Sequence, residues 1–97
     1  MQWRADVAVM LKPGVNDPQG LAVRDGLHRL GYAHVQDVRV GRYIQLWLEA
    51  DSETEATAQV EAMCQQLLAN PVIEQFWFSL TAQPVPAPNG TPRSGGA

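Results

Sequence analysis

The sequence lacks much of what several classes of function require. It has one cysteine among 97 residues, Cys64, which excludes an internal disulfide framework and fits a reducing compartment. Its formal net charge is −3, whereas binding to nucleic acid needs a basic face. No apolar run approaches the roughly 20 residues of a membrane span, and the opening MQWRADVAVM has no apolar signal-peptide core. We therefore expect a cytoplasmic protein without nucleic-acid or membrane partners.

Residues with catalytic or metal-binding chemistry are equally scarce. His28 and His34 show no metal-ligand spacing with Cys64, so we expect no metal. Cys64 has no basic neighbour in the sequence and occupies a helical core position, which is typical of a small buried residue rather than a nucleophile. Residues 12–14 match neither a Walker loop nor a dinucleotide fingerprint. We expect no catalytic residues and no cofactor bound by this chain.

What the sequence does contain is centred on residues 35–49, VQDVRVGRYIQLWLE. Apolar residues share one parity here and are interrupted only by Arg42: Val38, Val40, Ile44, Leu46 and Leu48. This alternation predicts a half-buried β-strand. As one strand the segment would be about 45 Å long at roughly 3.3 Å per residue, whereas a domain of this size is about 26 Å across. The projecting half would need another chain to cover it.

A hairpin is the alternative, with Gly41 and Arg42 as a two-residue turn. We favour one long or bent strand because Val40 and Tyr43 flank the glycine without other turn residues. Both versions leave apolar surface and a sheet edge without a partner. We therefore expect a homodimer or higher homo-oligomer, in which dimerisation through residues 35–49 completes the sheet.

Two helices and two further strands are predicted around this segment. Alternation over residues 2–12 predicts a first strand that Pro13 and Gly14 end. Asp17 and Pro18 then begin a helix, as N-cap and first helical residue. Its apolar stripe consists of Val23, Leu27 and Leu30, with Leu21 beside them, and Gly31 follows as the C′ residue.

The second half of the chain contains signals for a second helix and a last strand. Ser52 and Glu55 form a capping box that begins a second helix. Its apolar stripe consists of Ala56, Val60, Met63, Cys64, Leu67 and Leu68, and the helix ends before Pro71. A last strand has Phe76, Phe78 and Leu80 on one side and Trp77 on the other.

The order β-α-β-(β)-α-β favours an α+β, ferredoxin-like sheet with both helices on one face; the bracketed strand exists only if the hairpin forms. We place this domain at residues 1–81. Residues 82–97 hold four of the seven prolines and no bulky apolar residue except Val85, so we expect a disordered tail rich in proline and glycine.

The uncovered face of this sheet is the expected interaction surface. Tyr43, Trp47 and Trp77 are expected on it, and exposed aromatics at this density are typical of an interface. Arg39 and Arg42 are either solvated or salt-bridged, or contact a partner or an anion. For Arg42, in an apolar row, we expect an acceptor on another chain. The interface candidates are Lys12, Pro13, Gly14, Arg39, Gly41, Arg42, Tyr43, Trp47 and Trp77.

Four sequence blocks carry a family resemblance: LKPGV with DPQG, LGY, VRVGRYI, and LLANPVIE. In order and spacing they resemble PurS, the small subunit of bacterial and archaeal phosphoribosylformylglycinamidine synthase, over residues 4 to about 81. The chain departs from the usual pattern at Arg42, where lysine is common, at Gln45, where an acid is common, and in its extended tail.

The resemblance implies a subunit without catalytic residues. In that family a glutaminase subunit releases ammonia, and a large synthetase subunit uses ATP and magnesium to convert formylglycinamide ribonucleotide (FGAR) to the amidine (FGAM). The small subunit dimerises, bridges the other two and is thought to assist ammonia transfer. The alternative is an ACT-like regulatory dimer that binds a small molecule through residues 13–16. A stand-alone enzyme on a dimeric ferredoxin-like barrel is disfavoured by the missing acid–base pair.

Overall fold

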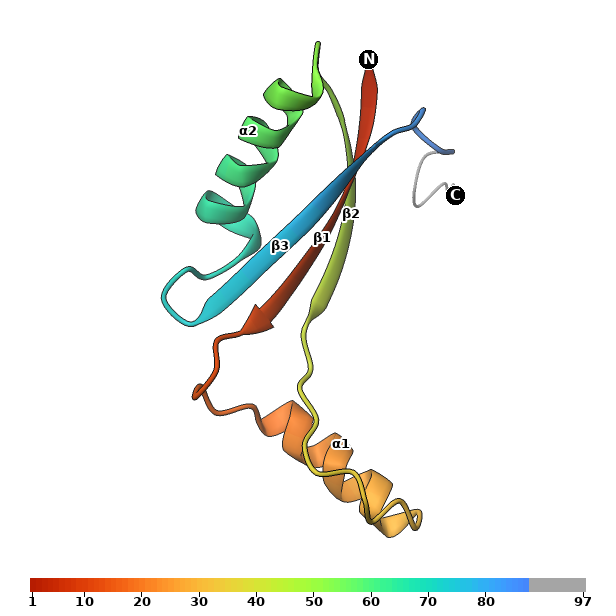
Figure 1. Ribbon diagram of the computed structural model, residues 1–97, viewed down its shortest axis with the longest axis vertical. Helices are drawn as coiled ribbons and strands as arrows, with labels where there is room; N and C mark the ends of the chain where they lie inside the picture. Colours follow the sequence, from red (N-terminus) through yellow and green to blue (C-terminus); the bar gives the residue numbers. More distant parts are fainter. Residues whose placement is uncertain (88–97) are drawn as a thin grey trace, which may run out of the picture.

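The computed structural model describes residues 1–87 and has one antiparallel sheet with helices at its side and end (Figure 1). Its elements are β1 (Gln2–Leu11), α1 (Pro18–Arg29), β2 (Arg42–Glu49), α2 (Glu53–Met63), the wider helical turn η1 (Cys64–Leu68) and β3 (Glu74–Ala82). The sheet order is β2-β1-β3. The predicted α+β class and β-α-β-α-β order are confirmed.

The hydrophobic core lies between the sheet and one side of α2. From β1, Ala5, Val7 and Val9 are fully buried, and they face Val60 and Cys64 of the helical layer. These small side chains make a small core, because no leucine or aromatic residue in the described range is completely buried. The chain therefore has little apolar burial with which to stabilise a lone monomer.

The helix α2 begins at the predicted capping box. The Oγ of Ser52 accepts the Glu55 amide at 3.1 Å, and the Glu55 carboxylate accepts the Asp51 amide at 3.0 Å. At the other end, the Ala69 amide donates to the Cys64 carbonyl five residues back. This wider turn shifts the phase of the apolar stripe. Leu67, predicted to belong to it, is consequently 82% exposed.

The arrangement differs from the predicted one in the position of α1. Figure 1 shows α2 beside the sheet and α1 projecting past the end of the sheet, at the bottom of the view. The helix instead lies along residues 35–41, and a Cβ at Gly20 would come within 2.1 Å of the Val38 carbonyl oxygen. This close approach requires glycine. The radius of gyration is 17.6 Å, against about 12–13 Å for a compact domain of this length.

The strand predicted over residues 35–49 is shorter than expected. It begins at Arg42, and residues 36–41 form neither a continuation of β2 nor the second strand of a hairpin. The reason is that, within residues 1–87, β2 pairs with β1 alone, and their last pair joins Val9 to Arg42. Beyond this pair the described part of the chain places no strand beside the segment. In the sheet, β2 is an edge strand and β1 is central.

The C-terminal strand extends just past the predicted domain boundary at residue 81. Ala82 is paired with Trp3, and the Gln83 amide donates to the Gln2 carbonyl at 3.0 Å. Most of the predicted disordered tail, residues 88–97, lies outside the described residues. Within residues 1–87, no helix is long and apolar enough to cross a membrane.

Candidate functional site

Residues 13–41 carry α1 and form an arm that projects from the sheet, and Asp17 anchors this arm. Its Oδ1 accepts the Gly20 amide at 2.9 Å and caps α1, while Oδ2 accepts the Val40 amide at 2.9 Å. The side chain is buried. The amides of Val40 and then Gly20 hold the pKa of Asp17 below its usual value. One carboxylate thus joins the start of the helix to the segment that enters β2.

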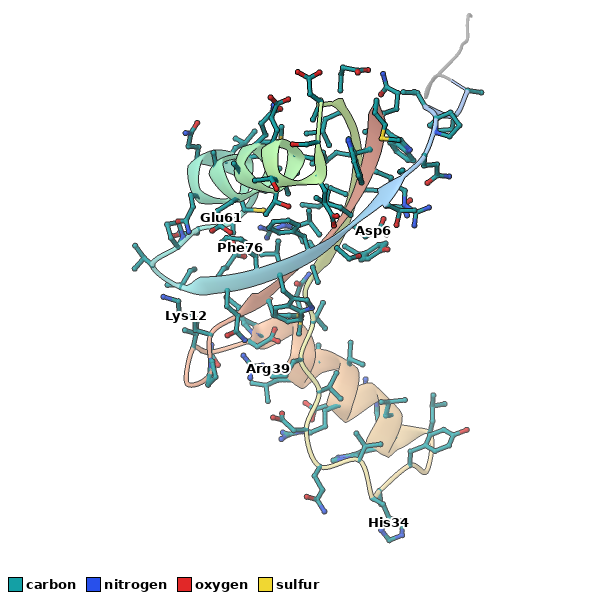
Figure 2. The ribbon with its side chains drawn as sticks, turned by 45° about the horizontal axis from the view of Figure 1, so that its top comes forward. Asp6, Lys12, His34, Arg39, Glu61 and Phe76 are labelled. Carbon is teal, nitrogen blue, oxygen red and sulfur yellow. The ribbon has the colours of Figure 1, made fainter. Side chains whose placement is uncertain are left out.

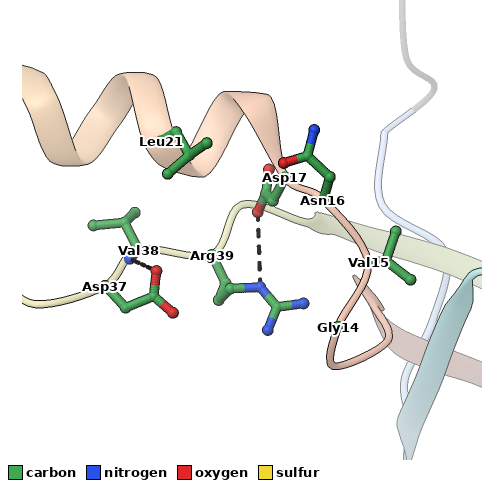
Figure 3. A pocket seen from close by; sticks show the side chains of 8 residues that line it. All are labelled: Gly14, Val15, Asn16, Asp17, Leu21, Asp37, Val38 and Arg39. Atoms are coloured by element: carbon green, nitrogen blue, oxygen red, sulfur yellow. Dashed lines mark hydrogen bonds and ion pairs between the residues drawn. The ribbon is translucent and has the colours of Figure 1, made fainter.

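Arg39 secures the base of the arm. Its guanidinium donates to the carbonyls of Leu11 at 2.8 Å and Lys12 at 3.2 Å, at the end of β1. Its Nε lies 3.9 Å from Oδ2 of Asp17, and Figure 3 shows this pair between α1 and the turn at Gly14. Arg39 therefore has acceptors within its own chain, and it orders the junction between arm and sheet.

A shallow pocket of about 240 Å³ lies beside these contacts (Figure 3). It is lined by Gly14, Val15, Asn16, Asp17, Leu21, Asp37, Val38 and Arg39. It is smaller than the ~300–1,000 Å³ typical of small-molecule sites. Asp17 and Arg39 are already bonded to backbone groups, and Asp37 accepts the Val38 amide at 2.9 Å. This engagement argues against the ACT-like alternative, which needs free polar groups here.

Arg42 has its acceptors within the chain, so the expectation of an acceptor on another chain is wrong. Its Nη1 donates to Oε2 of Glu74 at 2.9 Å and its Nη2 to Oε1 at 3.0 Å. The Nη2 also donates to the Leu68 carbonyl at 2.8 Å. The register explains this, because Arg42 and Phe76 both face Val9 from opposite sides of β1. The guanidinium thereby spans the sheet beneath the end of η1.

Glu74 holds the turn between η1 and β3 through the same carboxylate. Its Oε1 also accepts the Asn70 amide at 2.7 Å. The Arg42 guanidinium, and then the Asn70 amide, hold the pKa of Glu74 below its usual range. Glu74 is not among the residues predicted as interface candidates, and the sequence gives no signal for the hydrogen bond between Asp17 and the Val40 amide. Glu74 lies in the LLANPVIE block, but its partner is 32 residues away.

The face of the sheet opposite α2, called the bare face below, carries the predicted aromatic residues. The register places Tyr43 and Trp77 on either side of Ala8, and they are 67% and 54% exposed. Trp47 is half-buried and lies opposite Arg4 on the same face. Tyr43, Ala8 and Trp77 therefore form an apolar strip across all three strands, with the small Ala8 between the two exposed rings. An interface role for this strip remains a prediction.

A polar network occupies the bare face next to that strip. Asp6 accepts Nη2 of Arg4 at 2.9 Å and Nε2 of Gln45 at 3.0 Å, and Nη1 of Arg4 donates to Oε1 of Gln83 at 2.6 Å. Burial raises the pKa of Asp6, but the hydrogen bonds from Arg4 and Gln45 outweigh it and leave the pKa lowered. Figure 2 shows Asp6 on the side of the sheet away from α2, whereas Phe76 lies on the side toward it. The bare face therefore carries this polar network beside the aromatic residues.

The remaining candidates lie where the arm meets the sheet. The Nζ of Lys12 donates to the Pro71 carbonyl at 2.7 Å. Pro13 and Gly14 are exposed in the turn, and Gly14 has a φ of 88°, which glycine adopts without strain. At Gly41, a Cβ would lie 2.3 Å from the Val9 carbonyl oxygen. The glycine therefore allows the β1 backbone of the same chain to lie close to it.

Two observations on the described residues concern metal binding and nucleophilic chemistry. Within residues 1–87, no three His, Cys, Asp or Glu side chains are grouped so that they could hold a metal ion. Cys64 is buried, and burial raises the pKa of its thiol, with a smaller contribution from Glu61. A raised pKa disfavours the thiolate that a nucleophile requires. Within residues 1–87 the chain forms a small α+β domain with exposed aromatic residues on its bare face.

Comparison with known proteins identifies the family. Residues 4–82 match the PurS model, described as phosphoribosylformylglycinamidine (FGAM) synthase. The FGAM synthase subunit PurS of Synechocystis is 53% identical over 80 residues, covering 82% of this chain and 80% of the relative. The chain belongs to the PurS family, whose curated relatives are subunits of FGAM synthase, a ligase of purine biosynthesis.

Solved structures agree with this assignment. Thermus thermophilus PurS has a TM-score of 0.77 and 38% identity, covering 87% of this chain and all 100% of that chain. A chain in the structure of PurLQS from Thermotoga maritima also has a TM-score of 0.77, at 27% identity, covering 84% of this chain and 99% of that one. The resemblance stated from the four sequence blocks is thereby confirmed.

Proposed function

We propose that this chain is a non-catalytic subunit that bridges the glutaminase and synthetase subunits of FGAM synthase and assists ammonia transfer between them. The observation that carries the proposal is the separation of its exposed apolar surfaces. One lies on the bare face at Tyr43 and Trp77, one on α1 at Val23 and Leu30, and one around Leu67. Three surfaces in different places suit a subunit that contacts more than one neighbour.

The chemistry of the reaction supports a non-catalytic role. Release of ammonia from glutamine needs an activated nucleophile, and Cys64 is buried with a raised pKa. Activation of FGAR by ATP needs groups that hold phosphates and magnesium, and residues 1–87 show no metal-holding cluster. We therefore assign ATP and magnesium to the synthetase subunit. The structure of PurLQS from T. maritima contains a chain similar to this one, and this supports an assembly of this kind.

We propose in addition that the chain is a homodimer or higher homo-oligomer joined through residues 35–49. The support is that β2 is an edge strand and that residues 36–41 continue beyond its last pair with β1. An edge strand offers unpaired backbone groups to a second copy. Sedimentation that shows only monomer at tens of micromolar would refute this part of the proposal.

Reconstitution tests the bridging role directly. Purified synthetase and glutaminase subunits are mixed with FGAR and ATP, with and without this chain, and FGAM is measured with either glutamine or ammonium as the nitrogen source. We expect glutamine-dependent synthesis to require the chain and ammonium-dependent synthesis to proceed without it. Equal glutamine-dependent rates in both mixtures would contradict the proposal. The isolated chain should release no glutamate from glutamine and no phosphate from ATP.

A further inference from the structure

We infer that the free edge of β3 takes an extended strand from a partner subunit, which pairs with it through backbone hydrogen bonds. This inference rests on the bridging function proposed above and specifies one of its contacts. Three features of β3 carry it: backbone groups that face away from β1, an edge without the usual protection, and a row of half-buried apolar side chains beside that edge.

The first feature is the direction of the backbone groups. At the two ends of the strand pair, the Lys12 amide donates to the Ile73 carbonyl at 2.8 Å, and the Gln83 amide donates to the Gln2 carbonyl at 3.0 Å. Because alternate residues of an antiparallel strand bond to the same neighbour, the odd-numbered residues of β3 turn their backbone groups toward β1. The central residues whose backbone groups face the free edge are Phe76, Phe78 and Leu80. The described part of the chain places no strand beside them.

The second feature is the lack of protection at this edge. Edge strands are usually protected by lysine, by proline, or by a bulge that twists the edge away. The strand β3 contains no lysine, arginine or proline, and its one charged residue, Glu74, is bonded to Arg42 and to the Asn70 amide. Its nine pairs with β1 run from Trp3 to Leu11 without interruption, so the strand has no bulge. A regular edge of this kind is suited to pairing with another strand.

The third feature is a row of apolar side chains on the helix side of the same strand. Val7 and Val9 of β1 are buried, whereas Phe78 and Phe76, which pair with them, are only half-buried. Figure 2 shows Phe76 on the side of the sheet toward α2. Leu80 continues the row and is also half-buried. An added strand would place its alternate side chains beside this row, so we expect the partner segment to be apolar at alternate positions.

The position of the edge favours a different subunit over a second copy. The proposed homodimer joins at residues 35–49, which include β2 at the opposite edge of the sheet. If a second copy also paired with β3, each chain would have a neighbour at both edges, and the sheet would continue from copy to copy. A strand of the synthetase or glutaminase subunit ends this series. The chain then has its own copy at one edge and a partner subunit at the other, as a bridging subunit requires.

Residue-resolved hydrogen–deuterium exchange tests the strand addition in the full chain. The amides of Trp77 and Ser79 bond to β1 and should exchange slowly with and without a partner. The amides of Phe78 and Leu80 should exchange fast in the free chain and at least about tenfold more slowly with saturating purified synthetase or glutaminase subunit, as a gained hydrogen bond would cause. Only backbone pairing produces this alternation, because a partner on the bare face would cover side chains without selecting alternate amides.

The same measurement distinguishes the other occupants. Protection that is present in the free chain and rises with its own concentration would assign the edge to a second copy and overturn the inference. Binding of either subunit, measured by sedimentation, without protection of these amides in any complex would also overturn it, and the bridging function would stand. Failure of both subunits to bind would refute the proposed function together with the inference.

A matched pair of backbone variants provides an independent readout. Phe78→phenyllactic acid keeps the side chain but replaces the edge-facing N–H by an ester oxygen. It should change Tm by no more than a few degrees and raise the Kd for the partner subunit about three- to tenfold, as loss of one backbone hydrogen bond would. Tyr43→4-hydroxyphenyllactic acid makes the same change at the free edge of β2 and should leave this Kd unchanged wherever the homodimer persists. Equal Kd values for the two variants would contradict the inference.

Discussion

The carboxylate of Glu74, at the start of β3, receives two hydrogen bonds from the guanidinium of Arg42, at the start of β2, at 2.9 and 3.0 Å. The two strands lie on opposite edges of the sheet, so this pair ties its edges together across β1. The paired oxygens and nitrogens form the fork-to-fork geometry in which arginine binds carboxylates best. We therefore expect replacement of either residue to lower the stability of the fold as well as to affect assembly.

We predict that Arg42→Met lowers the free energy of unfolding by about 1 kcal/mol, or about 4–8 °C in Tm for a domain of this size. Methionine retains much of the stem's packing but leaves the largely buried Glu74 carboxylate with only the Asn70 amide. Arg29→Met, on the exposed last turn of α1, is the control and should change Tm by less than a few degrees. Thermal unfolding followed by circular dichroism measures both, and an unchanged Tm for Arg42→Met would show that the pair contributes nothing.

The second prediction concerns acid. Because the folded state lowers the pKa of Asp17 and of Glu74, it binds their protons less readily than the unfolded chain does. Their contribution to stability is therefore present above the unfolded values near 4 and is lost as the pH falls through the lower folded values. Urea midpoints should fall steeply below about pH 4 in the wild type.

Asp17→Asn should flatten this acid dependence, since an amide at this position does not titrate. It should also lower stability at pH 7, because it weakens the bonds to the Gly20 and Val40 amides. Asp51→Asn, at an exposed carboxylate before α2, should retain the wild-type slope. An Asp17→Asn protein as acid-sensitive as the wild type would show that the anchor does not govern the transition.

The third prediction separates the sheet from the residues that follow it. Truncation after Ala87 should leave Tm within a few degrees of the full chain, because residues 88–97 contain no bulky apolar side chain. Truncation after Thr81 should lower Tm further, because it removes Ala82 from β3 and Gln83 from its bonds to Gln2 and Arg4. Equal melting temperatures for both truncations would mean that these last contacts are not stabilising.

The local elements could be predicted because their signals are local. Alternation located β1 and β3, and the caps at Asp17 and Ser52 located both helix starts within a few residues of each signal. The position of α1 could not be predicted in this way. An apolar stripe shows that a helix side must be covered, but not which surface covers it. The same stripe at Val23 and Leu30 is compatible with a sheet of its own chain or of another.

The hydrogen-bond partners of the candidate residues could not be predicted from the sequence for a related reason. That Arg42 needs an acceptor follows from its apolar row, but Glu74 becomes that acceptor only through the registers of β2 and β3 on β1. Those registers are set by strand pairs that lie far apart in the sequence, such as Val9 with Arg42 and Leu11 with Glu74. The face of the sheet on which Tyr43 and Trp77 lie was easier to predict, because strand parity alone determines it.

The last prediction addresses the aromatic strip on the bare face. Tyr43 and Trp77 flank Ala8 and are more than half exposed, so their loss removes little burial from the lone chain. Exposed tryptophan and tyrosine are, in contrast, the residues that contribute most when a partner covers them. We therefore expect Trp77→Ser to change Tm by no more than a few degrees. It should weaken capture of the synthetase or glutaminase subunit by the tagged chain at least about tenfold, the scale of a hot-spot residue.

Val72→Ser is the control, at an apolar residue that is also exposed but lies in the loop before β3. Biolayer interferometry with each purified partner subunit, at matched chain concentrations, measures the two variants side by side. Sedimentation of Trp77→Ser alone shows whether the homo-oligomer is affected instead. If Trp77→Ser weakens only self-association, the bare face joins copies of this chain. If it binds both subunits as the wild type does and keeps its oligomeric state, the strip is not an interface, and the bridging contacts must lie on the arm, around Leu67 or at the edge of β3.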